Sequence, residues 1–270
     1  TKYKLLVLPD NITVDGAFKE KLLDYMAKGG KILLSGCSGV DKSGKFALDF
    51  GASFGGKNPL NPSYLRPEYD LYPNGKTSYI MYSNSYNVAL DDSFEGEVCV
   101  LRNDSYFNRT AEHFCSHMHA PNNPETNFAG AIIKGNIAYI GWDIFSAYAN
   151  HGHLCFKELF TYIIKKMMGD ETTVFADVPD RAVVTYTKQE KENRNILHLL
   201  FAHTTVRGRN TEVIEDTVPL YDVKCSVKCE AKPSKITLVP SGEEINFEYV
   251  NGRAEFTVPK VDIHQMVEIK

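Results

Sequence analysis

The stretch YKLLVLPDNITVDGAFKEKLLDYMAKGGKILL, residues 3–34, has the pattern of a strand, a helix and a second strand. The run from Tyr3 to Pro9 is apolar enough for a buried strand, and Thr13 is a residue type that caps helices. Gly29-Gly30 then ends a helix whose apolar residues recur at helical spacing: Phe18, Leu22, Leu23 and Met26. A strand, a helix and a strand within about 35 residues predict a right-handed βαβ unit and therefore a parallel sheet.

The rest of the first 169 residues adds shorter strands and one strong helix. The segment 51–75 is rich in Gly, Pro and Asn and shows little periodicity, so we expect a long surface excursion there. An amphipathic helix is predicted from His153 to Met168, and Gly169 closes the domain. Lys134-Gly135-Asn136 is expected to turn between the last two of four predicted strands: Ser78–Met81, Glu97–Leu101, Ala129–Ile133 and Ile137–Gly141. Residues 1–169 are therefore predicted to form an α/β domain.

After Gly169 the pattern changes to strands without helices. Polar turns separate them at the spacing that is typical of β-sandwiches. Asn251-Gly252 between two alternating runs predicts a two-residue type I′ hairpin. The predicted strands are Ala182–Thr187, Ile196–Ala202, Leu220–Cys229, Lys235–Val239, Ile245–Val250, Arg253–Val258 and Gln265–Ile269. We expect an all-β sandwich domain over residues 172–270.

Composition excludes several classes of protein. The chain of 270 residues is 43% hydrophobic and 24% charged, which is typical of globular domains and not of disordered chains. The net charge of −4 gives no attraction for phosphate backbones, so we expect no nucleic-acid partner. No apolar run approaches the roughly 20 residues of a membrane helix, so we expect no membrane partner. The segment 51–57 lacks the Lys-Ser/Thr ending of a phosphate-binding loop, and no cofactor is expected.

The six cysteines are scattered, without the dense spacing of a disulfide scaffold. Free buried thiols favour a reducing compartment such as the cytoplasm, whereas a signal peptide in a longer parent chain would direct the protein to the periplasm. The sequence therefore leaves the localisation open.

Several motifs resemble regions of bacterial glycoside hydrolases. GGKILLSGCSGVD (29–41), preceded by KLLVLP (4–9), resembles the middle of the trimerisation domain of bacterial β-galactosidases. Other motifs resemble a related group labelled α-L-fucosidase-like: YFNRT (106–110), EHFCSH (112–117), GNIAYI (135–140), IEDTVPLYDV (214–223) and EFTVPKVD (255–262). The resemblance spans nearly the whole chain.

This resemblance implies a fold and a role. The first domain would be flavodoxin-like, with the fold of class I glutamine amidotransferases, and incomplete at its N-terminus. The catalytic carboxylates would lie in an upstream barrel of the same parent chain. The resemblance thus implies a non-catalytic accessory and assembly region that forms a homo-oligomer. If the upstream strand of that domain is missing, the strand Tyr3–Pro9 has an unpaired edge. Unpaired strand edges favour association with another copy of the chain.

The segment 108–119 holds the most conspicuous polar cluster. In a strand, His113, Cys115, His117 and His119 would share one face, and imidazole with thiolate suits zinc. A second interpretation is a buried polar network in which Arg109 pairs with Glu112 or Asp143. A third is the rim of a saccharide pocket. The ligand-binding candidates are Arg109, Glu112, His113, His117 and Asp143.

Two further places carry chemistry-bearing residues. Trp142-Asp143 lies at a predicted strand end, where open α/β sheets bind ligands, although a structural role in the core is the alternative. Gly36-Cys37-Ser38-Gly39 is similar to a nucleophile turn, but Ser35 replaces its first glycine and no periodic helix follows. The leading hypothesis is therefore the accessory region of a glycoside hydrolase. The alternative is a stand-alone hydrolase or amidotransferase-like enzyme that uses Cys37 or the 113–119 cluster. A third class, a carbohydrate-binding β-sandwich, ranks lower, because the second domain offers mainly tyrosines and no tryptophan as exposed aromatic residues.

Overall fold

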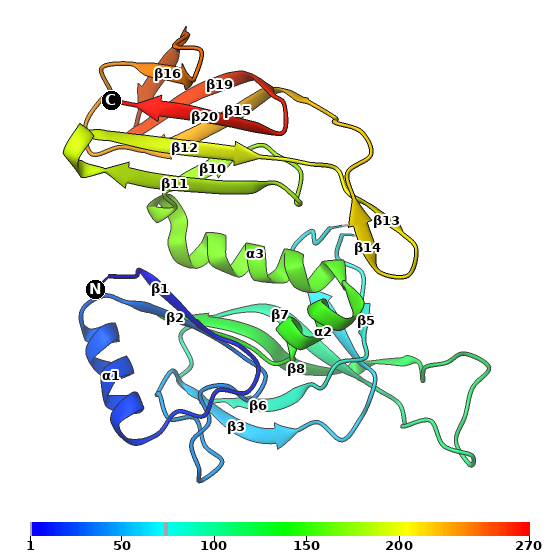
Figure 1. Cartoon of the computed structure of the whole chain (residues 1–270). Helices are drawn as coiled ribbons and strands as arrows, with labels where there is room; N and C mark the ends of the chain where they lie inside the picture. Colours follow the sequence, from blue (N-terminus) through cyan, green and yellow to red (C-terminus); the bar gives the residue numbers. More distant parts are fainter. Residues whose placement is uncertain (1, 73–74) are drawn as a thin grey trace. The chain divides into compact units, whose positions relative to one another are not determined.

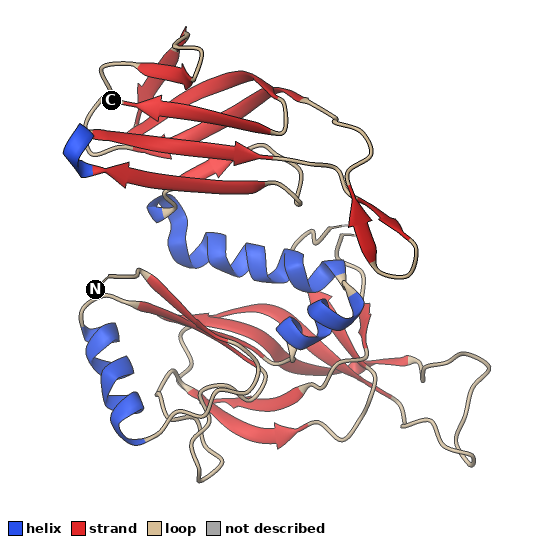
Figure 2. Ribbon diagram, in the orientation of Figure 1, coloured by secondary structure: helices blue, strands red, loops and turns tan. Residues whose placement is uncertain are grey.

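A computed structural model describes residues 2–72 and 75–270. The chain divides into two compact units, Thr1–Gly169 and Asp170–Lys270. Unit 1 combines sheets and helices, whereas unit 2 consists of strands and short 3-10 helices (Figure 1, Figure 2). Among the described residues, no helix is both long and apolar enough to cross a membrane.

A seven-stranded mixed sheet forms the centre of unit 1. Its strands, in spatial order, are β1 (Leu5–Leu8), β2 (Lys31–Ser35), β9 (Ile137–Ile140), β8 (Asn122–Lys134), β7 (Glu97–Ser105), β4 (Ser63–Pro67) and β5 (Tyr79–Met81). Only β1–β2 and β2–β9 pair in parallel, and the other neighbours are antiparallel. The parallel sheet expected from the βαβ pattern is therefore limited to three strands, because hairpins and antiparallel pairs build the rest.

Helices and a small sheet cover the two faces of this sheet. Alternating side chains of each strand point to opposite faces, which creates two cores. One core contains α2 (Ile144–His151) and α3 (Leu154–Met168). The other contains Leu22 of α1 (Gly16–Ala27) and Val88 of β6 (Tyr86–Leu90), which pairs with β3 (Ala52–Lys57) in a two-stranded sheet.

Two local predictions for unit 1 are wrong. Helix α1 begins at Gly16 after Asp15, without a side-chain cap, so Thr13 is not its N-cap. The segment 51–75 is not a surface excursion, because it contains β3 and β4, and Leu65 of β4 is fully buried. The predicted turn at Gly135-Asn136 is confirmed, since Lys134 pairs with Ile137.

Unit 2 has two sheets around one core. Four strands form the first sheet, in the order β10 (Val174–Ala176), β15 (Leu220–Lys228), β19 (Arg253–Val261) and β18 (Phe247–Val250). Five strands form the second, in the order β11 (Val183–Gln189), β12 (Arg194–Leu200), β20 (His264–Ile269), β16 (Ile236–Val239) and β17 (Glu244–Ile245). Buried residues of both sheets, such as Val227 and Leu197, share the core. A hairpin of β13 (Thr205–Arg207) and β14 (Thr211–Val213) and the 3-10 helices Gly169–Glu171 and Glu190–Glu192 complete the unit.

The hairpin predicted at Asn251-Gly252 is confirmed. Val250 pairs with Arg253, and Asn251 and Gly252 have φ angles of 51° and 75°. Positive φ at both central residues is the geometry of a type I′ turn. The local Asn-Gly pattern thus fixes the register between β18 and β19.

Candidate functional site

The carboxyl ends of the three parallel strands bring Asp10, Cys37 and Asp143 to one edge of the sheet. Gly36 follows β2 with a φ of 60°, and a Cβ on it would lie 2.3 Å from Asp143 Oδ1 and 2.5 Å from the Asp10 carbonyl oxygen. Only glycine permits this close approach. The sequence predicted Asp143 at such an edge, but it gave no role to Asp10.

Asp10 is a structural carboxylate. The Ser35 hydroxyl donates to Asp10 Oδ1 at 2.8 Å, and the Ser146 amide and hydroxyl both donate to Oδ2 at 2.7 Å. The amide of Phe145 also donates to Oδ1, at 3.3 Å. A negative charge at the first turn of α2 is favourable, because the unpaired amides of a helix point out there. With both oxygens occupied, Asp10 holds α2 against β1 and β2.

Asp143 is half-buried and lies beside two polar side chains. Asn84 Nδ2 donates to Asp143 Oδ2 at 2.7 Å, and the Tyr86 hydroxyl donates to the same oxygen at 3.3 Å. Burial raises the pKa of Asp143 above its usual range, and these two hydrogen bonds act in the opposite direction. Burial and the nearby Asp143 raise the pKa of Tyr86. Sequence analysis missed Asn84 and Tyr86, which come from a segment with no periodic pattern.

Cys37 lies at the end of a strand, as the nucleophile of a strand–turn–helix motif does, but among the described residues neither the helix nor a histidine partner of that motif accompanies it. The residues after β2 form turns, and no helix begins at Cys37. The amide of Cys37 donates to the Asp10 carbonyl at 2.7 Å, which ties this loop to the end of β1. Within residues 2–72 and 75–270, no histidine hydrogen-bonds to the thiol. The geometry therefore gives Cys37 no histidine base, and the neighbour of its thiol is the Tyr86 hydroxyl.

A cysteine–histidine contact occurs elsewhere, at Cys155 and His153. Cys155 Sγ lies 3.0 Å from His153 Nδ1, at the start of α3. The thiol is 1% exposed, and burial raises its pKa to about 12. At neutral pH the thiol is protonated, and a thiol is a weak nucleophile. The contact therefore belongs to the packing of α3, and sequence analysis did not single it out.

The segment 106–121 is an exposed loop, not a strand. It joins β7 to β8 and projects from unit 1 (Figure 1). Pairing between these strands ends at Ser105 and Asn122, so the alternation of His113, Cys115 and His117 does not create a common strand face. Among the described residues, no group of three His, Cys, Asp or Glu side chains is arranged to hold a metal ion.

Hydrogen bonds attach this loop to neighbouring segments. Asn108 accepts from the Asn61 amide at 2.8 Å and donates to the Pro59 carbonyl at 2.7 Å. The Tyr82 hydroxyl lies 3.1 Å from His119 Nδ1, and the Tyr64 hydroxyl donates to the Ala120 carbonyl at 2.6 Å. Both ends of the loop are therefore fixed.

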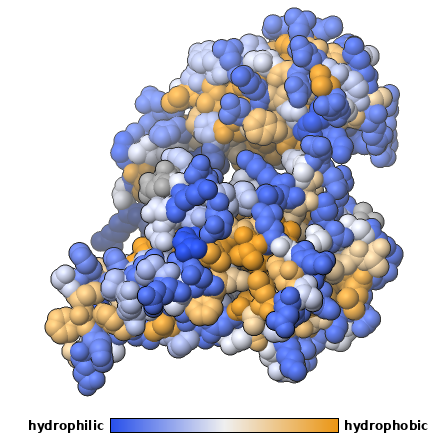
Figure 3. Space-filling view, turned by 180° about the vertical axis from the view of Figure 1, so that it is seen from behind, coloured by the Kyte–Doolittle hydropathy of each residue, from blue (hydrophilic) through white to orange (hydrophobic). Residues whose placement is uncertain are grey.

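The loop nevertheless exposes large apolar side chains. Phe114 is 70% and Met118 is 84% exposed. Apolar atoms lie at the surface of the projecting loop when the molecule is viewed from behind (Figure 3). Exposed apolar side chains beside charged and polar ones are typical of interaction surfaces.

The prediction that Arg109 belongs to a buried polar network is wrong. Arg109 and Glu112 are exposed, and neither pairs with the other or with Asp143 in the described part of the chain. Arg102 forms the buried network instead. It donates to the Tyr86 carbonyl and to Asn87 Oδ1, both at 2.7 Å, and its Nε lies 3.3 Å from Asp104 Oδ1.

The chain is similar to one region of a solved enzyme structure. It matches the α-L-fucosidase isoenzyme 2 from Paenibacillus thiaminolyticus with 34% identity and a TM-score of 0.94, over 99% of this chain and 41% of that chain. A cold-adapted β-galactosidase from Rahnella sp. R3 gives 11% identity and a TM-score of 0.49, over 98% of this chain and 32% of that chain. No protein-family model and no curated protein matches. This chain thus has the fold of one region of the fucosidase and spans less than half of its length.

Proposed function

We propose that this chain is a non-catalytic accessory and assembly region of a glycoside hydrolase that acts on carbohydrate, with an α-L-fucoside as the substrate class. The observation that carries the proposal is the match to the fucosidase over both units at 34% identity. The catalytic carboxylates would lie in a barrel of the same parent chain.

Two acidic residues of unit 1, Asp10 and Glu112, support a role outside the chemistry. Glycoside hydrolysis uses two carboxyl groups about 5–10 Å apart, one of which must donate a proton or attack the sugar. Both oxygens of Asp10 are occupied by donors from Ser35 and Ser146, so Asp10 is unsuited to either task. Glu112 lies in the exposed loop, without a contact to Asp143 among the described residues.

The loop 106–121 is the surface that we assign to assembly. Its fixed ends and its exposed Phe114 and Met118 suit packing against a neighbouring protomer. Arg109, Glu112, His113 and His117 would then lie at the rim of a saccharide pocket completed by that neighbour. Their side chains supply both hydrogen-bond donors and acceptors, as recognition of sugar hydroxyls requires.

The strand β1 offers a second surface for association. Among the described residues it pairs with β2 alone and forms one edge of the seven-stranded sheet, and Val7 is 36% exposed. Open edges of this kind pair with other chains. We also propose that unit 1 derives from a flavodoxin-like domain, of which the parallel strands β1, β2 and β9 and the helix α1 form the common part.

The alternative function, a stand-alone hydrolase or amidotransferase-like enzyme, has less support. Cys37 has neither a helix behind it nor a histidine partner in the described residues. In the 113–119 cluster, His113 and His117 are exposed, and the Cys115 thiol donates to the His119 carbonyl at 3.0 Å.

Hydrolysis assays test the proposal. We expect the 270-residue chain to hydrolyse neither p-nitrophenyl α-L-fucoside nor glutamine, and the full-length gene product to hydrolyse the fucoside. Turnover by the 270-residue chain that disappears in Cys37→Ala or Asp143→Asn would contradict the proposal.

The double variant Phe114→Ser/Met118→Ser of the full-length product should lose activity, whereas Tyr221→Ser, an exposed change in unit 2, should not.

A further inference from the structure

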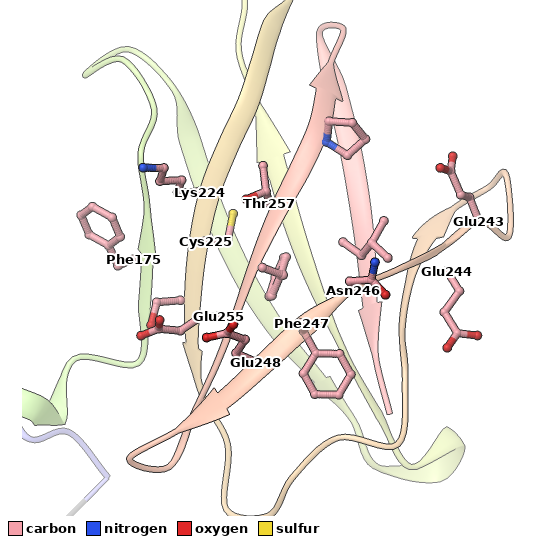
Figure 4. Close-up of a pocket in the computed structure, with 14 residues that line it drawn as sticks. Phe175, Lys224, Cys225, Glu243, Glu244, Asn246, Phe247, Glu248, Glu255 and Thr257 are labelled. Carbon is pink, nitrogen blue, oxygen red and sulfur yellow. The ribbon is translucent and has the colours of Figure 1, made fainter.

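We propose that a groove on the first sheet of unit 2 binds a neutral saccharide. The groove has a volume of about 940 Å³ and is lined by residues of β10, β15, β17, β18 and β19. Figure 4 shows Phe175 at one end, Glu248 and Glu255 in the middle and Glu243 at the other end. This inference takes the class of ligand from the proposed function and adds a second site.

The strand registers place four lining side chains in one row. Phe175 is opposite Ser226, Ser226 is opposite Glu255, and Glu255 is opposite Glu248. Neighbouring strands are about 4.8 Å apart, so the row is about 14 Å long. That length suits a small oligosaccharide lying across the strands.

Repulsion between Glu248 and Glu255 lowers the stability of unit 2. Like charges directly opposite each other on neighbouring strands are destabilising. Neither carboxylate forms an ion pair or hydrogen bond within the described residues. Both side chains are exposed, and their four oxygens are acceptors only. A ligand rich in hydroxyl donors satisfies such oxygens, and the cost in stability points to a function for the pair.

Phe175 supplies the apolar part of the groove. It is 55% exposed on a strand whose neighbours Val174 and Ala176 pack toward the core. An exposed phenyl ring beside a few polar groups is the composition of small-molecule sites. The apolar face of a sugar ring can lie on the phenyl ring while the hydroxyls reach the carboxylates.

The charges of the groove select against other ligands. Four glutamates line it: Glu243, Glu244, Glu248 and Glu255. The cations are fewer: Lys224 lines the groove, and Arg253 donates from Nε to Ser226 Oγ in the row at 2.7 Å. An anionic ligand is repelled by this balance. No group of three acidic or histidine side chains among the described residues is arranged to hold a metal ion. A neutral polyol is the class that fits the remaining donors and acceptors.

Ligand-observed NMR of the 270-residue chain tests this inference without any enzymatic activity. The probes are methyl α-L-fucoside, fucosyllactose and lactose, with calcium chloride and spermidine as separate additions. We expect at least one sugar to bind, with affinity at least tenfold lower in Phe175→Ala and in Glu248→Gln. The matched control Tyr221→Ala removes an exposed ring outside the groove and should leave binding unchanged.

Stability gives an independent readout of the same variants. Glu248→Gln should raise the urea midpoint of unit 2 while it weakens sugar binding, because it removes the repulsion and one set of acceptors. Absence of sugar binding at tens of millimolar, equal binding by Phe175→Ala and the wild type, or binding of calcium or spermidine alone would overturn the inference. None of these outcomes depends on the loop 106–121, so failure here is distinct from failure of the assembly proposal.

Discussion

Two sets of polar side chains in unit 1 lie in opposite surroundings. Arg102 and Asp10 are buried, and their charged groups meet donors or acceptors at 2.7–3.3 Å. Arg109 and His113 lie on the exposed loop, next to Phe114 and Met118. Buried polar groups must be paired to be tolerated, so the first set maintains the fold. The second set is open to a partner, and substitutions there should leave the fold intact.

The largest expected effect is the loss of Arg102. Arg102→Met removes the guanidinium that contacts Tyr86, Asn87 and Asp104, and leaves the Asp104 carboxylate without its buried counter-charge. Breaking a buried pair in this way costs about 3–5 kcal/mol of the free energy of unfolding. Urea denaturation of unit 1 measures it. Arg109→Met is the matched control, with an expected change in the free energy of unfolding within about 0.5 kcal/mol. Equal losses for the two variants would show that the buried and the exposed polar residues do not differ in their contribution to the fold.

Asp10→Ala should have the next largest effect. It removes the acceptor of Ser35 and Ser146 and the negative charge at the start of α2. Buried hydrogen bonds to a charged group contribute about 1.5–3 kcal/mol, and we expect a loss of that size. Asp10 has a φ of 52°, which Asn tolerates better than Ala, so Asp10→Asn should lose less. A greater loss in Asp10→Asn than in Asp10→Ala would contradict this reasoning.

Asn251→Ala tests whether the Asn-Gly turn between β18 and β19 stabilises unit 2. The residue has a φ of 51° in the type I′ turn, and alanine is strained there. We expect a loss of about 1 kcal/mol in the free energy of unfolding of unit 2. An unchanged midpoint in chemical denaturation would show that the turn does not contribute to stability.

The smallest expected effect is on pH dependence. The pKa of Asp143 is raised by burial above its usual value of 3.8, so the folded chain binds this proton more tightly than the unfolded chain. The stabilisation from the protonated group is full below pH 3.8 and declines as pH rises from 3.8 through the raised pKa. Asp143→Asn should remove this decline from the stability of unit 1. A variant with the same pH dependence as the wild type would show that another group causes it.

The sequence predicted the elements that depend on local pattern. Residues 3–34 form a strand, a helix and a parallel strand because their apolar spacing is complete within the segment. The order of the seven-stranded sheet was not predictable, since β4 lies in a Gly- and Pro-rich segment whose residues become a strand only between β7 and β5.

In the candidate site, too, the features set by local sequence pattern were predictable and those set by strand pairing were not. The end of β9 was predictable as the location of Asp143, because a polar residue follows an apolar run there. The choice between Arg102 and Arg109 as the buried arginine depends on which strand has partners on both sides, and one sequence does not show this. The alternation of His113, Cys115 and His117 matches a strand, but no partner strand exists for it among the described residues.

Sedimentation velocity of the wild type and of Phe114→Ser/Met118→Ser tests most directly whether the exposed loop is an assembly surface. We expect the wild-type chain to form dimers or larger species at micromolar concentration and the double variant to shift toward the monomer, with an unchanged urea midpoint for unit 1. Tyr221→Ser, an exposed change in unit 2, should associate like the wild type. A wild type that is strictly monomeric, or association that is the same in the double variant, would contradict the assignment of the loop 106–121 to assembly.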